Sequence, residues 1–175
     1  MSEQEGFALW LTGIPASGKS SITRELVKQL RACRVSVVVL ESDEMRKILT
    51  PAPTYSDEER SRFYRALVLI GRLITRSGIN VIFDATANKR AYRDHARQEI
   101  PKFIEVYVVC PQEVCVKRDP KGIYAQAAGK TATNVPGIQA AYEPPLSPDL
   151  TLDGQALPAL EASKIMDALK KALYI

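Results

Sequence analysis

The chain has 175 residues, of which 46% are hydrophobic and 25% are charged, with a net charge of +4. This length fits one domain with a full core, and the composition is that of a soluble globular protein. We find no apolar run long enough for a membrane span and no secretory leader, so we expect a cytoplasmic setting without a membrane partner. A nucleic-acid-binding surface is expected to be more basic than +4 implies.

Three cysteines, Cys33, Cys110 and Cys115, show no metal-ligand spacing, and their odd number argues against a disulfide framework. Cys33 and Cys110 lie in apolar stretches of the sequence, which predicts buried, inert thiols.

Apolar, β-branched runs and helical patterns alternate along the chain. Near-continuous apolar runs predict strands buried on both faces of a parallel sheet, and a shorter run predicts a fifth strand; these runs are residues 7–11, 35–40, 79–83, 104–109 and 150–152. Helical spacing follows the first run, begins again at a capping box over residues 56–59, ends near Gly78, and returns over residues 160–173. The order predicts a single α/β domain over residues 1–175, a doubly wound parallel five-stranded sheet with helices on both faces.

The most informative motif is Gly13-Ile14-Pro15-Ala16-Ser17-Gly18-Lys19-Ser20, which fits G-x-x-x-x-G-K-[ST], the phosphate-binding loop of nucleoside-triphosphate enzymes. It follows a predicted strand and opens a predicted helix, as the motif requires, although a glycine turn between strand and helix is the simpler alternative. We expect Lys19 to reach the terminal phosphates and Ser20 to bind Mg²⁺. The predicted nucleotide-binding residues are Gly13, Ala16, Ser17, Gly18, Lys19, Ser20, Ser21 and Arg118.

Two aspartates follow predicted strands on the ligand side of such a sheet. Asp84 ends the third strand beside the phosphate loop, which favours a metal-side role, whereas Asp43 is the better candidate for orienting an attacking hydroxyl. Helix capping is the alternative for both. Four arginines could grip an anionic acceptor, and each could equally be a solvated surface residue: Arg46, Arg60, Arg90 and Arg93. The single histidine, His95, is expected to be structural.

A basic, proline-containing stretch over residues 112–148 predicts a lid above the phosphates, with an irregular solvent loop as the alternative. A closing lid would bring Arg118 and Lys121 to the transferred phosphoryl group and exclude water.

The lid residues Arg118-Asp119-Pro120-Lys121-Gly122-Ile123-Tyr124 closely resemble the R-D-P-K-G-L-Y segment of adenylylsulfate kinases. Pro136-Gly137-Ile138 and Tyr142-Glu143-Pro144-Pro145 resemble that family's F-T-G-I-D and P-Y-E-x-P segments, and the likeness spans the chain. The resemblance implies transfer of the ATP γ-phosphoryl group to the 3′-hydroxyl of adenosine 5′-phosphosulfate (APS), with Mg²⁺, and it is compatible with a homodimer. The substrate-binding residues it implies are Asp43, Arg46, Tyr55, Arg60, Phe63, Arg90 and Lys121.

The sequence departs from the family at the acceptor end. Glu41-Ser42 replaces Asp-Gly, Phe63 replaces a substrate-contacting asparagine, and Asp84-Ala85-Thr86-Ala87-Asn88 replaces A-F-I-S-P. Val135 replaces one of two phenylalanines that sandwich adenine, and Tyr55 can stand in for the other. These departures leave open a related P-loop kinase acting on another small-molecule or RNA-linked hydroxyl, and a non-catalytic nucleotide-binding module.

Overall fold

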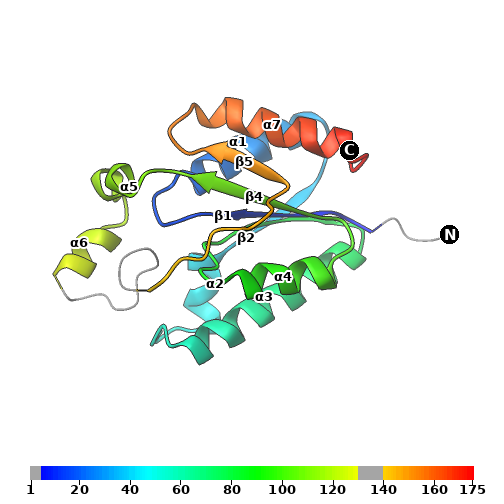
Figure 1. The fold of residues 1–175 in the computed structure, drawn as a ribbon. Coiled ribbons are helices and arrows are strands. Elements are labelled where there is room, and N and C mark those ends of the chain that lie inside the picture. Colours follow the sequence, from blue (N-terminus) through cyan, green and yellow to red (C-terminus); the bar gives the residue numbers. More distant parts are fainter. Residues whose placement is uncertain (1–4, 130–139) are drawn as a thin grey trace.

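The computed structural model describes residues 5–129 and 140–175, and within them five strands form one parallel sheet (Figure 1). The strand order is β2-β3-β1-β4-β5, and every neighbouring pair is parallel. The strands are β1 Ala8–Thr12, β2 Val37–Glu41, β3 Asn80–Asp84, β4 Phe103–Val109 and β5 Leu150–Asp153. The helices are α1 Lys19–Ala32, α2 Ser42–Leu49, α3 Asp57–Arg76, α4 Arg90–Glu99, α5 Gln112–Arg118, α6 Ile123–Ala128 and α7 Pro158–Lys171.

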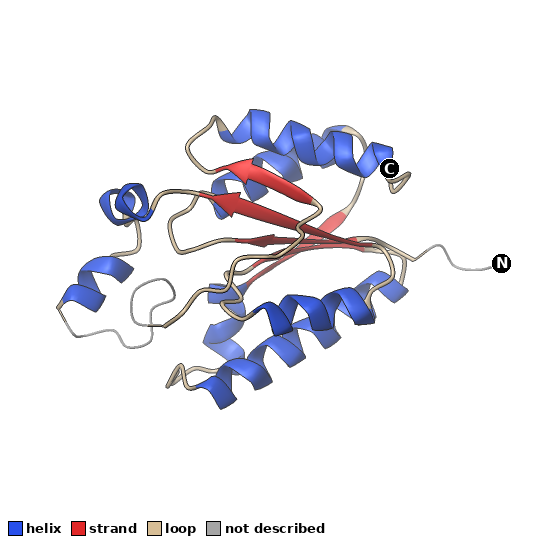
Figure 2. Ribbon diagram, viewed as in Figure 1, coloured by secondary structure: helices blue, strands red, loops and turns tan. Residues whose placement is uncertain are grey.

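Helices cover both faces of the sheet, which confirms the predicted doubly wound α/β fold (Figure 2). Leu9 and Leu11 of β1 pack in a cluster with residues of α1 and α7, whereas Ala8 and Trp10 pack in a second cluster with residues of α3 and α4. Successive side chains of a strand point to opposite faces, so a continuous apolar strand serves two cores at once.

The prediction that all the strands are buried on both faces is wrong for β2. Val38 and Val39 are 37% and 38% exposed. These side chains are exposed because β2 lies at the edge of the sheet, where β3 is its neighbouring strand. The expected burial of Cys33 is also wrong, since this thiol is exposed just after the end of α1, while Cys110 and Cys115 are buried.

Helix α3 begins where the sequence predicts. The Ser56 hydroxyl accepts a hydrogen bond from the Glu59 backbone N–H at 3.2 Å, which is half of the predicted capping box. The Glu59 carboxylate instead accepts from the backbone N–H groups of Thr54 at 2.6 Å and Tyr55 at 3.2 Å. This bonding ties the loop before α3 to the first turn of the helix and fixes the Tyr55 backbone there.

The carboxyl ends of the strands and the segments that follow them lie on one side of the molecule, together with α2, α5 and α6 (Figure 1). The described part of the segment expected to be a lid contains two short helices, α5 and α6, and the 140–145 stretch returns along the start of α4. No helix in residues 5–129 or 140–175 is both long and apolar enough to cross a membrane.

Candidate active site

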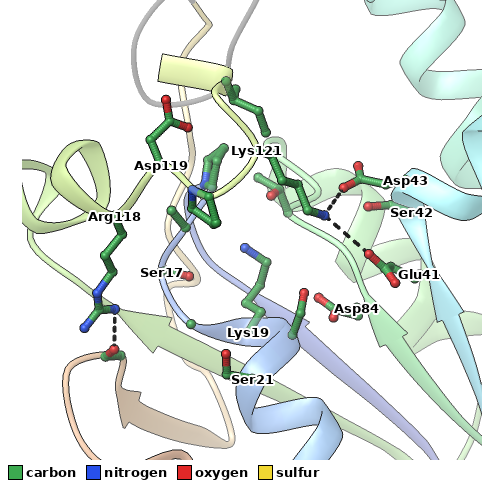
Figure 3. A pocket seen from close by; sticks show the side chains of 18 of the residues that line it. Ser17, Lys19, Ser21, Glu41, Ser42, Asp43, Asp84, Arg118, Asp119 and Lys121 are labelled. Atoms are coloured by element: carbon green, nitrogen blue, oxygen red, sulfur yellow. Dashed lines mark hydrogen bonds and ion pairs between the residues drawn. The ribbon is translucent and has the colours of Figure 1, made fainter. Parts of the chain in front are cut away.

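A cavity of about 760 Å³ opens at the carboxyl ends of the strands. Its walls come from the phosphate loop, the start of α2, the first turns of α3, the end of β3 and the α5–α6 segment, and Figure 3 shows this meeting of side chains. In parallel α/β sheets this edge is where ligands bind.

The loop between β1 and α1 has the backbone geometry of an anion cradle. Gly13 has φ +153°, and a Cβ there would lie 2.5 Å from the Val108 carbonyl oxygen, so only glycine fits. Gly18 caps α1 in the left-handed conformation without a side-chain cap, so the N-terminal amides of this fourteen-residue helix face the cavity side. Ser17 Oγ is buried without a hydrogen-bond partner among the described residues, which suits a phosphate oxygen as its partner.

Lys19 begins α1 and lies inside the loop. Its ammonium donates hydrogen bonds to the carbonyl oxygens of Gly13 and Ile14, both at 2.9 Å. The side chain is only 8% exposed even in the empty loop, because these carbonyls hold it inward. Burial lowers the pKa of Lys19, and Asp84 and Asp43 oppose that shift.

Asp84 ends β3 next to the start of α1 and is 5% exposed. Its carboxylate is hydrogen-bonded to the Ser20 side chain, and Lys19 lies close enough to favour its charge. Burial nevertheless raises the pKa of Asp84 above the ordinary value. A hydroxyl and a carboxylate side by side at the mouth of the loop are oxygen ligands of the kind Mg²⁺ takes, together with phosphate oxygens and waters.

Asp43 lies in the first turn of α2 across the cavity from the loop (Figure 3). Lys121, from the segment between α5 and α6, reaches over and donates to Asp43 at 2.5 Å and to Glu41 at 3.4 Å. Burial alone would lower the pKa of Lys121, but the two carboxylates raise it above the ordinary value. The Lys121 ammonium is therefore kept in its charged form on the wall of the cavity.

Two arginines line the acceptor side of the cavity, Arg46 of α2 and Arg60 of α3. The Arg46 guanidinium lies over the Phe63 ring at 3.9 Å and pairs with Glu59 at 3.5 Å. The Arg60 Nε donates to the Tyr55 carbonyl oxygen at 3.1 Å, and burial lowers the pKa of Arg60. The Tyr55 ring lies beside both guanidinium groups, at 5.2 Å from Arg46 and 5.5 Å from Arg60.

Two residues expected at the substrate do not line this cavity. Phe63 is 1% exposed and lies beneath Arg46, so it supports a guanidinium from below. Arg90 points to the 143–144 segment, where its guanidinium donates to the Pro144 carbonyl oxygen at 3.1 Å. Phe63 therefore acts on the acceptor side only through Arg46, whereas Arg90 ties the start of α4 to the 143–144 segment.

The proposed anion-gripping role of Arg93 is wrong. Its guanidinium is fully buried and donates to Glu105 at 2.6 Å, to the Glu143 carbonyl oxygen at 2.7 Å and to the Ala87 carbonyl oxygen. Arg93 is a structural tie between α4, β4 and the stretch that returns from the lid.

At the nucleotide end, Arg118 of α5 lines the cavity beside the loop after β5. Its guanidinium donates to the Gly154 carbonyl oxygen at 2.7 Å. The Tyr124 hydroxyl donates to the Pro15 carbonyl oxygen at 2.8 Å and so joins α6 to the phosphate loop. The α5–α6 segment is thereby seated over the loop.

The sequence reasoning missed several cavity residues, among them Glu41, Tyr64 and Thr86. Glu41 pairs in register with Asp84 on the neighbouring strand, which could have been anticipated from the strand ends alone. Tyr64 carried no signal, because it resembles an ordinary core residue, whereas Thr86 lies in the 84–88 stretch that departs from the family pattern. Val135, expected near the adenine, lies outside the described residues.

The comparisons with known proteins agree with this geometry. The family model described as adenylylsulphate kinase matches residues 5–153. A protein of Pyrococcus abyssi named probable adenylyl-sulfate kinase is 36% identical, over 98% of this chain and 99% of its own length. An adenylyl-sulfate kinase of Rippkaea orientalis is also 36% identical, over 99% of this chain and 96% of its own.

A solved structure of an adenylylsulfate kinase also matches this chain in its fold. The structure of the Mycobacterium tuberculosis APS kinase CysC in complex with AMPPNP and APS superimposes with a TM-score of 0.90 at 30% identity. The match covers 95% of this chain and 98% of that one. The resemblance carried by the phosphate loop and the lid motif therefore extends to the whole fold, and the chain belongs to the adenylylsulfate kinase family.

Proposed function

We propose that this enzyme transfers the γ-phosphoryl group of ATP to the 3′-hydroxyl of APS, giving 3′-phosphoadenosine 5′-phosphosulfate and ADP. The observation that carries the proposal is that one cavity joins the phosphate loop to Arg46, Arg60 and Tyr55. One end of that cavity is built for a polyphosphate and the other for an aromatic, anionic acceptor. The adenylylsulfate kinase relatives and the AMPPNP–APS complex of the Mycobacterium tuberculosis enzyme support both assignments.

The nucleotide end binds ATP through the loop amides, Ser17, Ser21 and the N-terminus of α1. Lys19 moves from the carbonyl oxygens of Gly13 and Ile14 to the terminal phosphates. Arg118 lies where it can flank the nucleotide. These groups neutralise charge on the phosphates, which is the main contribution a kinase makes to phosphoryl transfer.

The pair Ser20 and Asp84 fits Mg²⁺, with the hydroxyl as a ligand and the carboxylate holding coordinated water. Ser20 and Asp84 would hold the ion, and Mg²⁺ would supply positive charge that neutralises the transferred phosphoryl group. Asp84 must be ionised for this task, and Lys19 and the Ser20 hydroxyl both favour its charged form.

In the transfer step the 3′-oxygen of APS forms a bond to the γ-phosphorus while the bond to the β–γ bridging oxygen breaks, and ADP leaves. Asp43 orients the 3′-hydroxyl and accepts its proton. Lys121 lies beside Asp43 and Glu41, so it can turn from these carboxylates to the transferred phosphoryl oxygens. The exposed Lys121–Asp43 pair adds little to stability, which leaves it free to exchange partners.

The acceptor end holds APS by its charge and its base. Arg46 and Arg60 bind the phosphosulfate, and Tyr55 stacks on adenine. Closure of the α5–α6 segment over the loop would exclude water from the transferred group, and the hydrogen bond from Tyr124 to the Pro15 carbonyl oxygen supports this. The cytoplasmic setting and a homodimer remain predictions, the latter measurable as molar mass in solution.

The test is a product assay with ATP, Mg²⁺ and APS, run beside other small hydroxyl acceptors. We expect a 3′-phosphorylated product from APS, and we expect Lys19→Ala to abolish it without unfolding the chain. Lys28→Ala is the matched control, because the Lys28 side chain is 70% exposed and pairs with Glu25 on the same helix. Phosphorylation of another hydroxyl compound in place of APS would contradict the assignment of APS as the acceptor. Full turnover by Lys19→Ala would contradict the assignment of the phosphate loop as the nucleotide site.

A further inference from the structure

Asn88 is a buried polar residue with an unusual set of partners. It lies in the loop between β3 and α4, four residues after Asp84, and is 4% exposed. It belongs to the stretch in which the sequence departs from the family pattern, where the asparagine stands in place of a proline. A buried side-chain amide is costly unless its groups are bonded, so its partners indicate what it does.

The oxygen of the amide is turned toward the acceptor side. Asn88 Oδ1 accepts a hydrogen bond from Arg60 NH1 at 3.3 Å, and Arg60 Nε donates to the Tyr55 carbonyl oxygen at 3.1 Å. Arg60 is itself 4% exposed and lines the cavity. Hydrogen bonds on two of its nitrogens thus orient the planar guanidinium, and one of them comes from Asn88.

The rest of Asn88 is turned toward the stretch that returns from the lid. Its Nδ2 donates to the Ala141 carbonyl oxygen at 3.2 Å, and its backbone carbonyl accepts from the Glu143 N–H at 2.7 Å. The Glu143 carboxylate accepts from the Arg90 N–H at 2.8 Å, which closes the connection to α4. One residue therefore joins the acceptor-side arginine to the base of the lid segment.

The neutral amide suits this position. A carboxylate would also accept from Arg60, but it would neutralise the guanidinium that has to attract an anionic acceptor. It would also place an oxygen against the Ala141 carbonyl oxygen, where only a donor fits. An amide orients Arg60 and leaves its charge to the ligand.

We propose that Asn88 is a positioning residue that aims Arg60 at the anionic group of the acceptor and ties it to the 141–143 stretch, so that Asn88 sets acceptor affinity. The inference rests on the proposed function for the identity of the acceptor. It needs no contact between Asn88 and the substrate.

The experiment measures KM for APS, KM for ATP, kcat and Tm in Asn88→Ala and Asn88→Asp. Removing a hydrogen bond to a charged group predicts a rise in the KM for APS of roughly tenfold in Asn88→Ala, with the KM for ATP nearly unchanged. We expect Asn88→Asp, which has almost the same shape, to raise the KM for APS at least as much. Wild-type turnover of APS, measured first, tests the proposed function separately.

Asn80 provides the matched control. It also makes two hydrogen bonds, accepting from the Phe7 N–H at 3.0 Å and donating to the Ser36 carbonyl oxygen at 2.8 Å, but it lies at the opposite end of β3. Asn80→Ala should lower Tm without changing either KM.

A double-mutant cycle with Arg60→Ala then tests the route of the effect. If Asn88 acts through Arg60, Asn88→Ala adds little to the KM for APS once Arg60 is gone. The proposal is overturned if the folded Asn88 variants keep the wild-type KM for APS, if both KM values rise together, or if the effect persists in full without Arg60.

Discussion

At the residue scale, the two aspartates of the cavity differ in burial and in partner. Asp84 is buried beside Ser20, whereas the Asp43 side chain is 53% exposed and pairs with Lys121. The first environment suits a group that holds a metal-bound water, and the second suits a group that meets an incoming hydroxyl. The two substitutions to asparagine should therefore have different kinetic signatures.

We expect Asp84→Asn to raise the Mg²⁺ concentration needed for half-maximal activity by roughly 10-fold to 100-fold, as for other groups that orient metal ligands. Asp43→Asn should instead lower kcat by roughly 100-fold or more at saturating Mg²⁺, because it removes the proton acceptor. Initial rates across a Mg²⁺ titration distinguish the two. If the magnesium dependence follows Asp43, the two roles must be exchanged.

The raised pKa of Asp84 also predicts a pH-dependent stability. Because the folded-state pKa lies above the unfolded value, the fold favours the protonated form, and the penalty for the buried charge grows as the pH rises through that interval. Asp84→Asn should therefore have a higher Tm than the wild type at pH 7 without ligands, and the difference should shrink as the pH falls toward 4. Thermal melting over this pH range measures it, and a lower Tm for the variant at pH 7 would mean that Lys19 outweighs burial.

At the scale of elements, the packing of α3 on the sheet depends on a glycine. A Cβ on Gly71 would lie 2.2 Å from Cζ of Phe83, which is fully buried. We expect Gly71→Ala to cost about 1–3 kcal/mol in overpacking, a fall in Tm of roughly 2–12 °C for a chain of this size.

The double variant Gly71→Ala with Phe83→Leu separates overpacking from a change in helix propensity. Removing the ring should relieve the clash, so the double variant should lose less stability than the two single losses added together. Strict additivity of the two losses would contradict the close-contact explanation.

Much of this architecture could be predicted, because it is encoded locally. The apolar runs located the strand ends to within two residues, and the Ser56–Glu59 pattern located the start of α3. The phosphate loop is a contiguous motif between a strand and a helix, so its place at the head of α1 followed directly. The features that could not be predicted are side-chain contacts between residues far apart in the sequence.

Arg60 and Arg93 illustrate that limit. Both are arginines on helices near family motifs, and the sequence makes them equal candidates for an anion. The structure places Glu105 of β4 on Arg93, which occupies it, and leaves Arg60 lining the cavity. The burial of β2 was mispredicted for the same reason. An apolar run does not reveal the order of the strands, and so does not reveal that β2 lies at the edge of the sheet.

At the scale of the whole molecule, the fold brings three distant segments to one edge of the sheet. The phosphate loop, the α2–α3 region and the α5–α6 segment contribute Lys19, Asp43 and Lys121 to one cavity. A cavity shared in this way allows direct transfer between two bound substrates without an enzyme-bound intermediate.

The most direct measurement of that claim follows the γ-phosphoryl group itself. The enzyme is incubated with Mg²⁺, APS and ATP labelled at the γ-phosphate, and the position of the label in the products is determined. We predict that the label appears on the 3′-oxygen of a product that still carries its sulfate, in equal amount to the ADP formed. Label found only in free phosphate, or on a different acceptor while APS is unchanged, would contradict it.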